Sequence, residues 1–278
     1  MNVWQADFYR RPLQNETGQV LWELLICDPT GNVIYESFCP QPDVTRDWLL
    51  SQVQVAAAKT GLPDAIHVFR PQSFNLFQEV GEQLGVKVEA TRRTPALKQR
   101  LQERTLEYPQ HQNYTGEAYN PLSLDKPPPV PLPENLWGDR WRFASIPAGD
   151  IEEGFAQRPI PILHLPNQLL PLQLGLASTV AVPGVVIDGG RQSMPLARWL
   201  QAVQPVTLNY IPGAPDGLIL EAGLVERWVM ATFEDEEVAA AARLYEQRKQ
   251  TSQGLHFLLV QPDDSGMTYT GFWLLMAD

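Results

Sequence analysis

The chain has 278 residues, of which 44% are apolar, and its 21 Lys and Arg against 32 Asp and Glu give a formal charge of −11. Such a length allows two hydrophobic cores, and the acidity excludes general adhesion to phosphate backbones or anionic lipids, so that any nucleic-acid contact has to be local. Cys27 and Cys39 lie in apolar, strand-like runs, which excludes the disulfide framework of a small secreted scaffold and favours a reducing compartment.

Residues 1–107 are expected to form one domain in which three strands precede alternating helices and strands. Turn-forming residues separate the strands, as in Asp28-Pro29-Thr30-Gly31-Asn32. The order βββαβαβα predicts a mixed sheet with helices on its faces and is found in ribonuclease-H-like domains. The expected elements are strands over 6–10, 20–27 and 33–38, a helix over 44–59 capped by Asp43, a strand over 65–69, a helix over 73–84, a strand over 86–90 and a helix over 95–106.

Residues 108–150 are rich in Gln, Asn, Tyr and Pro, which predicts an extended connector between two domains. Three aromatic residues, Trp137, Trp141 and Phe143, come near its end. We interpret them as packing anchors on a domain surface, because a base-stacking groove needs more cations than Arg140 and Arg142 supply.

Residues 151–278 are expected to form a second mixed α/β domain (an α/β, or α+β, fold overall). The stretch 159–187 has no charged residue, yet its prolines at 161, 166, 171 and 183 break a helix, so we expect no membrane span. Buried or loop-wrapped structure is favoured there, and a surface for an apolar partner is the alternative. The expected elements are strands over 162–165 and 185–187, a helix over 195–203, a strand over 206–211, a hairpin over 218–233, a helix over 236–249, and strands over 256–260 and 267–275.

The topology of the first domain makes a metal-dependent nuclease the enzyme hypothesis, because that chemistry needs several carboxylates that converge on two divalent cations. Asp7, Glu23 and Asp28 are the candidates. Two further positions lack an acid, since the interior of the first helix has none and the fourth strand ends in His67-Val68-Phe69-Arg70. We therefore expect no complete catalytic site, and binding is favoured over catalysis.

Other motifs give weak signals for chemistry. Asp188-Gly189-Gly190-Arg191 could bring backbone amides to a phosphate, but without a full GxGxxG or Walker pattern a tight turn is favoured. The histidines at 67, 111, 164 and 256 are too widely spaced for a zinc site, and neither cysteine belongs to a CxxC pair. We expect no metal and no cofactor.

One local basic cluster runs from the end of the fifth strand through the following helix. Arg100 and Arg104 are neighbours four residues apart on that helix, while Lys98 points to another face and Glu103 opposes the positive charge. This cluster is either a patch that contacts phosphates or an ordinary helix face exposed to solvent, and the sequence is compatible with both. With a second basic edge near the N-terminus, the candidate RNA-contacting residues are Tyr9, Arg10, Arg11, Arg92, Arg93, Lys98, Arg100 and Arg104.

Three segments together resemble the Tab2/Atab2 family of RNA-binding translation factors. They are WQADFYRRP over 4–12, LWELLICD over 21–28, and the tripeptide Trp273-Leu274-Leu275 near the C-terminus, a signature of that family. From the sequence itself the tripeptide is either a buried last strand or a docking element for a partner. Because the chain begins almost at the first family motif, without the look of a transit peptide, we expect a cytoplasmic, cyanobacterial member; relatives of plants and algae act in the chloroplast stroma.

The resemblance implies a non-enzymatic protein that binds the 5′ untranslated region of the mRNA for the photosystem I subunit PsaB and promotes its translation, and with it photosystem biogenesis. The charge of −11 is unusual for such a protein. Stacking of RNA bases on Phe8, Tyr9, Trp137 or Trp141 would need fewer cations. The alternative is an assembly or scaffold factor that binds protein partners of translation or photosystem assembly, and a metal-dependent nuclease is the third possibility.

Overall fold

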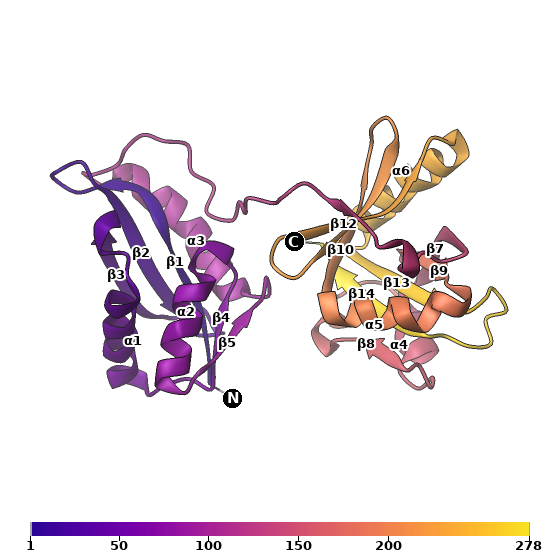
Figure 1. Cartoon of the computed structure of the whole chain (residues 1–278), viewed down its shortest axis with the longest axis horizontal. Helices are drawn as coiled ribbons and strands as arrows, with labels where there is room; N and C mark the ends of the chain where they lie inside the picture. Colours follow the sequence, from indigo (N-terminus) through magenta and orange to yellow (C-terminus); the bar gives the residue numbers. More distant parts are fainter. Residues whose placement is uncertain (1, 278) are drawn as a thin grey trace. The chain divides into compact units, whose positions relative to one another are not determined.

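Three mixed sheets organise residues 2–277, the part of the chain that the computed structural model describes (Figure 1). One sheet belongs to the unit Met1–Asp125, and the other two belong to the unit Lys126–Asp278. Each sheet combines parallel and antiparallel neighbours, and helices pack against the strands. The mixed α/β class expected from the sequence is therefore confirmed.

The first unit has the element order expected from the sequence. Its elements are β1 (Val3–Gln14), β2 (Val20–Cys27), β3 (Val33–Pro40), η1 (Gln41–Asp43), α1 (Arg46–Thr60), β4 (Ala65–Val68), α2 (Pro71–Leu84), β5 (Lys87–Ala90), α3 (Pro95–Glu107) and η2 (Tyr108–Gln110), where η marks a short 3-10 helix. The strand order in the sheet is β3-β2-β1-β4-β5. The first three strands are antiparallel, and β4 and β5 run parallel to β1.

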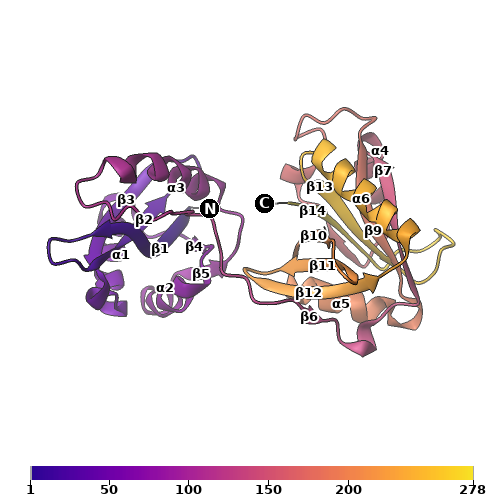
Figure 2. The ribbon, with the colours of Figure 1, turned by 90° about the horizontal axis from the view of Figure 1, so that it is seen from above.

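The strand β2 is buried on both faces, as its nearly continuous apolar sequence predicts. Leu24 and Ile26 pack in the core that α1 and α2 cover, whereas Leu25 and Cys27 pack in the core that α3 covers. Figure 2 shows α1 and α2 on one side of the sheet and α3 on the other. The alternation of side chains along a strand thus divides this unit into two cores.

The cap of α1 is Thr45, so the expected cap Asp43 is wrong. The Thr45 hydroxyl accepts a hydrogen bond from the Trp48 amide at 3.2 Å, and Thr45 has the extended backbone that an N-cap needs. Asp43 instead lies in η1, because Pro42 favours a tight turn there. The strand β1 also continues past its expected end at residue 10 to Gln14, through an irregular register with β2.

The second unit contains the sheets β10-β11-β12-β6 and β7-β9-β13-β14-β8. The elements are β6 (Val130–Pro131), η3 (Glu134–Leu136), β7 (Arg140–Pro147), α4 (Ala148–Phe155), β8 (Ile162–His164), η4 (Asn167–Leu169), β9 (Ala181–Asp188), η5 (Gly190–Gln192), α5 (Ser193–Val203), β10 (Pro205–Ile211), β11 (Asp216–Ala222), β12 (Glu226–Phe233), α6 (Glu236–Thr251), β13 (Leu255–Gln261) and β14 (Gly271–Met276).

The segment 108–150, expected as a connector, is shared between the two units. Its last part is folded, because β7 pairs with β9 along its whole length, from Arg140 opposite Asp188 to Pro147 opposite Ala181. Residues of β7 are exposed or half-buried, as befits an edge strand, so they form no continuous apolar run. For this reason the composition predicted a connector where β7 lies.

The uncharged stretch 159–187 forms η4, β8, most of β9 and the intervening loops. Ile160, Leu176 and Val182 are buried and pack in the same core as α4. The lack of charge therefore reflects burial at these positions, as one of the two alternatives predicted. Within residues 2–277, no helix has both the length and the apolar character that crossing a membrane requires.

The tripeptide Trp273-Leu274-Leu275 lies in β14, which is flanked by β13 and β8 within its sheet. Trp273 and Leu275 pack in the core that includes α5, and Leu274 packs on the opposite face of the sheet with α4. Gly271 allows the Trp273 ring to lie against the strand, because a Cβ at position 271 would come within 2.5 Å of that ring. Docking through this tripeptide would require β14 to leave the sheet.

A buried histidine, His256, joins β13 to β10. Its Nε2 accepts from the Leu208 amide at 3.0 Å, which leaves the proton on Nδ1, where it is donated to the Gly254 carbonyl at 2.8 Å. Burial, with a smaller effect from the charge of Lys249, lowers the pKa of His256 from 6.5 to about 3. The folded chain therefore holds this ring neutral.

Replacement of His256 by Gln is expected to remove one source of acid instability. Because the unfolded chain binds a proton near pH 6.5 and the folded one does not, this contribution to stability is complete above pH 6.5 and is lost as the pH falls towards 3. Relative to His256→Gln, the native chain should lose about 1.4 kcal/mol of unfolding free energy per pH unit in that window.

Urea unfolding from neutral pH to about pH 4.5 measures this difference. The substitution His111→Gln, at an exposed position, is the matched control and should leave the unfolding free energy near the native value. A constant difference between the native chain and His256→Gln across the window would contradict the assignment.

Candidate nucleic-acid interface

The carboxyl ends of the parallel strands β1, β4 and β5 meet at one edge of the first sheet. Their parallel pairing ends at Ala6, Val68 and Ala90. Ligands of open α/β sheets commonly bind at such an edge, which makes it the candidate interface. The chain just beyond the paired residues supplies its charged side chains, Asp7, Arg10, Arg11, Arg70, Arg92 and Arg93.

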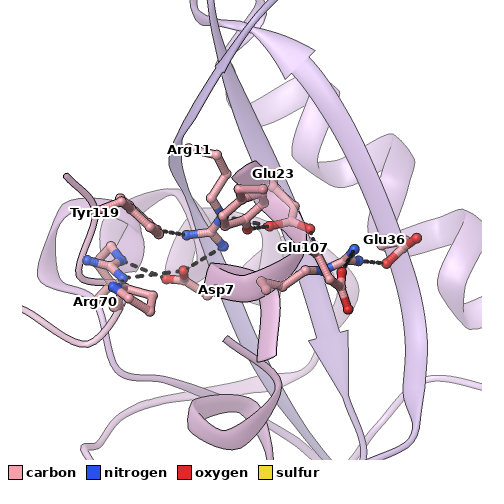
Figure 3. Close-up of polar contacts among 10 residues, drawn as sticks. Asp7, Arg11, Glu23, Glu36, Arg70, Glu107 and Tyr119 are labelled. Carbon is pink, nitrogen blue, oxygen red and sulfur yellow. Dashed lines mark hydrogen bonds and ion pairs between the residues drawn. The ribbon is translucent and has the colours of Figure 1, made fainter. Parts of the chain in front are cut away.

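Asp7 is buried and is held by two arginines (Figure 3). Its Oδ1 accepts from Nε of Arg70 at 2.8 Å, and its Oδ2 accepts from Arg11 at 2.9 Å. Burial alone would raise the pKa of Asp7, but the charges and hydrogen bonds of Arg70 and Arg11 outweigh it and keep the pKa below its usual range. Asp7 is therefore ionised, with both oxygens engaged.

Glu23 on β2 extends the same arrangement. Its Oε2 accepts from Nε of Arg11 at 2.6 Å and from the Tyr108 hydroxyl at 2.7 Å. Its Oε1 faces Nε of Arg104 at 3.3 Å. Burial raises the pKa of Tyr108, so this hydroxyl stays protonated and donates. We call Asp7, Arg11, Glu23 and Arg70 the buried ionic network.

A strap formed by residues 113–123 covers this network. The strap is tied to β1 by hydrogen bonds from the Gln14 amide to the Asn113 carbonyl and from the Thr115 amide to the Pro12 carbonyl, each 3.0 Å long. The Tyr119 hydroxyl accepts from Arg11 at 2.7 Å, and the Pro121 carbonyl accepts from Arg70 at 2.7 Å. Residues that were expected in a connector thus complete the partners of the two buried arginines.

The structure separates the expected basic residues into two groups. At the sheet edge, the side chains of Arg10 and Arg93 are exposed, whereas Arg11 and Arg92 are 2% and 4% exposed. On α3, Lys98 is half-buried. Arg100 and Arg104 share that helix but pair with carboxylates.

The two arginines of α3 are locally neutralised. Arg100 pairs with Glu103 and Glu107, each at 2.9 Å. Arg104 pairs with Glu107 at 2.7 Å and also with Glu36 of β3 (Figure 3). The helical spacing correctly placed Arg100 and Arg104 side by side, but their opposing carboxylates leave this helix face with little net positive charge.

Arg70, which was not among the residues expected from the sequence, lies at the centre of the edge. Its guanidinium carbon lies 4.0 Å from the centroid of the Tyr9 ring, so one face of this expected stacking residue is occupied. A charged residue directly after a parallel strand was the signal that could have identified Arg70. Its partner Asp7, 63 positions away, could not be read from the spacing.

The other aromatic candidates differ in their availability. Phe8 is fully buried and stacks on Trp48 with ring centroids 5.1 Å apart. Trp141 is half-buried and packs against Phe143 at 5.3 Å, as a packing anchor should. Trp137 is 57% exposed and is the most accessible of these three aromatic residues.

The three carboxylates of the nuclease hypothesis do not converge on one cation site. Asp7 and Glu23 hold guanidinium groups, and Asp28 lies in an exposed turn where it accepts from the Thr30 hydroxyl at 2.6 Å. The hydrogen bonds of Thr30 and then Asn32 lower the pKa of Asp28 to about 2. Among residues 2–277, no three His, Cys, Asp or Glu side chains are grouped closely enough to hold a metal ion.

The two glycine amides of the turn after β9 are already engaged by the protein. The Gly189 amide donates to the Gln261 carbonyl at 2.8 Å, and the Gly190 amide donates to the Pro262 carbonyl at 2.9 Å. Gly190 has a φ of +50°, and a Cβ there would meet the Asp139 carboxylate. The tight-turn interpretation is therefore confirmed for this motif.

Asp7→Asn is expected to lower the unfolding free energy by about 3–5 kcal/mol, because Arg70 would stay buried without its counter-charge, and Arg11 would retain Glu23 but lose one of its two counter-charges. Denaturant unfolding measures the loss. Asp47→Asn is the matched control, since Asp47 is exposed and pairs only with Arg46 in this structure, and it should cost less than about 1 kcal/mol. Equal effects of the two substitutions would contradict a structural role for the buried ionic network.

Comparison with solved structures finds distant similarities. The catalytic core domain of HTLV-2 integrase is 18% identical, with a TM-score of 0.26, over 38% of this chain and 70% of that chain. The catalytic domain of Mos1 mariner transposase is 15% identical, with a TM-score of 0.29, over 42% of this chain and 63% of that chain.

Sequence comparison gives a firmer relation. Residues 3–104 match the family described as RNA-binding protein Tab2/Atab2 N terminal, and residues 119–276 match RNA-binding protein Tab2/Atab2, C-terminal domain. Proteins named TAB2 homolog, chloroplastic, from Zea mays and Arabidopsis thaliana are each 30% identical over 280 residues, which cover 98% of this chain and 71% and 74% of those proteins. The chain therefore belongs to the Tab2/Atab2 family of RNA-binding proteins.

Proposed function

We propose that the chain is a non-enzymatic RNA-binding factor that binds the 5′ untranslated region of a photosystem I reaction-centre mRNA, of the psaB type, and promotes its translation. Membership of an RNA-binding family supports the RNA partner. The choice of this transcript rests on the resemblance of the N-terminal and C-terminal segments to the Tab2/Atab2 family. The proposal keeps the cyanobacterial cytoplasm as the compartment, whereas the two plant relatives are named as chloroplastic.

The observation that carries the non-enzymatic part is the pairing of Asp7 and Glu23 with arginines. The strand order β3-β2-β1-β4-β5 supports a ribonuclease-H-like scaffold for the first unit. A nuclease on that scaffold would need carboxylate lone pairs for divalent cations that activate water. Here Arg11 and Arg70 occupy the oxygens of Asp7, and Arg11 also binds Glu23. A guanidinium neutralises charge but does not activate water, so the edge suits holding RNA.

Within this proposal, Arg10 and Arg93 contact RNA phosphates. Both side chains are exposed at the edge where the parallel strands end. Arg11 and Arg92 are buried, and Arg100 and Arg104 are half-buried beside carboxylates, so Arg10 and Arg93 are the most accessible of the candidate arginines. So small a number of phosphate contacts is compatible with a chain whose overall charge is negative.

The double substitution Arg10→Glu with Arg93→Glu is expected to weaken binding to psaB leader RNA and to reduce its salt dependence. For single-stranded RNA, the loss of two phosphate contacts lowers the slope of log affinity against log salt by about 1.4. Filter binding over a salt series measures both quantities. The matched control is Arg46→Glu with Lys59→Glu, which reverses two exposed charges on α1.

An equal loss in the edge variant and the α1 variant would indicate general electrostatics and contradict the contact assignment. Absence of binding by the native chain would overturn the RNA proposal itself. The same RNA incubated with magnesium or manganese should stay intact. Cleavage that Asp7→Asn abolishes would restore the nuclease hypothesis.

A protein-binding assembly factor is the second candidate, and the charge of −11 favours it, because an acidic surface repels a nucleic acid and tolerates a basic protein partner. Pull-down with the tagged native chain, with and without ribonuclease, separates the two functions. The RNA proposal predicts that co-purifying proteins are lost after ribonuclease treatment, and their retention would favour the scaffold function.

A further inference from the structure

The second unit encloses a cavity of about 550 Å³ that the proposed RNA function does not use. Residues 131–141 cross over one side of the cavity, and residues 229–232 of β12 form a wall. Val185, Leu208 and Leu258, from β9, β10 and β13, line the inner end and are fully or nearly fully buried. Small-molecule pockets typically have volumes of about 300–1,000 Å³, and this cavity falls within that range.

The lining is apolar except at its solvent-facing rim. Among the described residues that line the cavity, Arg140 carries the only formal charge and Thr232 the only hydroxyl, and both are exposed. The Trp137 ring nitrogen is already engaged, since it donates to the Leu132 carbonyl at 3.0 Å. A ligand inserted here thus meets apolar side chains along its length and one cation at its end.

This distribution of charge decides between ligand classes. A nucleobase pushed into the inner end would bury the donors and acceptors of its edges without side-chain partners, which is costly. An aliphatic chain loses no hydrogen bond there and gains from its removal from water. Cavities lined by apolar side chains bind apolar molecules readily.

Arg140 is able to receive an acidic group. Its guanidinium pairs with Asp264 at 2.9 Å and lies 3.6 Å from Asp188, with the Arg140 side chain 65% exposed and that of Asp264 61% exposed. Exposed pairs of this kind contribute little, so a ligand carboxylate or phosphate can take the place of Asp264. Asp188 keeps its other partners, Arg142 at 2.9 Å and Gln261 at 2.8 Å.

We propose that this cavity binds a small amphipathic molecule, an aliphatic chain that fills the apolar interior and an acidic head group that pairs with Arg140. The site is separate from the RNA-contacting edge and does not rest on the RNA function. Free fatty acids and lipid-like phosphates share the required chemistry. Laurate is the probe for the acidic head group, and dodecanol is the probe for the chain alone.

Isothermal titration with the full chain, below the micelle concentration, tests the proposal. We expect saturable binding of both probes, laurate more tightly, and an affinity that rises about fourfold for each methylene from octanoate to laurate. Dodecyl phosphate should bind at the same site and compete with laurate. No saturable binding of either probe, or binding that uridine monophosphate competes away, would overturn the proposal.

Two variants locate the ligand. Ala231→Phe fills the cavity from β12 and should abolish binding of both probes, while Ala240→Phe, at an exposed position of α6, should not. Arg140→Gln should weaken laurate about threefold to fivefold and leave dodecanol unchanged, whereas Arg191→Gln should change neither. Unchanged laurate binding in both Ala231→Phe and Arg140→Gln would place the ligand elsewhere. Thermal melting of Ala231→Phe reports its folding independently of ligand binding.

Discussion

Two carboxylates and two guanidinium groups lie out of contact with water in the first unit, and each can stay there only beside a counter-charge. Burial of a charge without its partner costs several kcal/mol, a large part of a typical protein's stability, so the positions of Asp7, Arg11, Glu23 and Arg70 are coupled. Their partners come from β1, β2, the end of β4, η2 and the strap (residues 113–123). Displacement of any of these segments would leave a charge without its partner. One electrostatic constraint therefore fixes five segments that are far apart in the sequence.

That constraint also shapes what the sheet edge can do. The carboxyl ends of parallel strands usually provide free polar groups for a ligand, but here most of them bind one another. The strap adds the Tyr119 hydroxyl and the Pro121 carbonyl, which occupy remaining donors of the two arginines. The side chains that remain exposed to solvent at this edge, such as those of Arg10 and Arg93, therefore lie outside the buried ionic network. In the proposed function, a scaffold whose order of elements suggests hydrolysis serves binding instead.

The sequence predicted those parts of the structure that depend on local pattern. The bounds of β2 followed from its run of apolar residues, and the position of Arg100 beside Arg104 on one helix face followed from helical spacing. It did not reveal β7, because an edge strand with exposed Arg140 and Arg142 has the composition of a loop. Contacts between residues far apart in the sequence could not be predicted either. Asp7 meets Arg70 across 63 positions, and Arg104 meets Glu36 across 68, and no periodicity connects such residues.

The acidity of the chain and its membership of an RNA-binding family are compatible once charge is considered locally. Affinity for RNA depends on the phosphates neutralised at the contact surface, and distant charges are screened beyond about 8 Å at physiological ionic strength. Several of the arginines that the sequence offered, Arg11, Arg100 and Arg104, already neutralise carboxylates within the first unit. Few cations then remain for phosphate, so the salt dependence of binding should be shallow. Selectivity for one transcript would have to come from bases stacked or hydrogen-bonded at the surface, because phosphate contacts carry no sequence information.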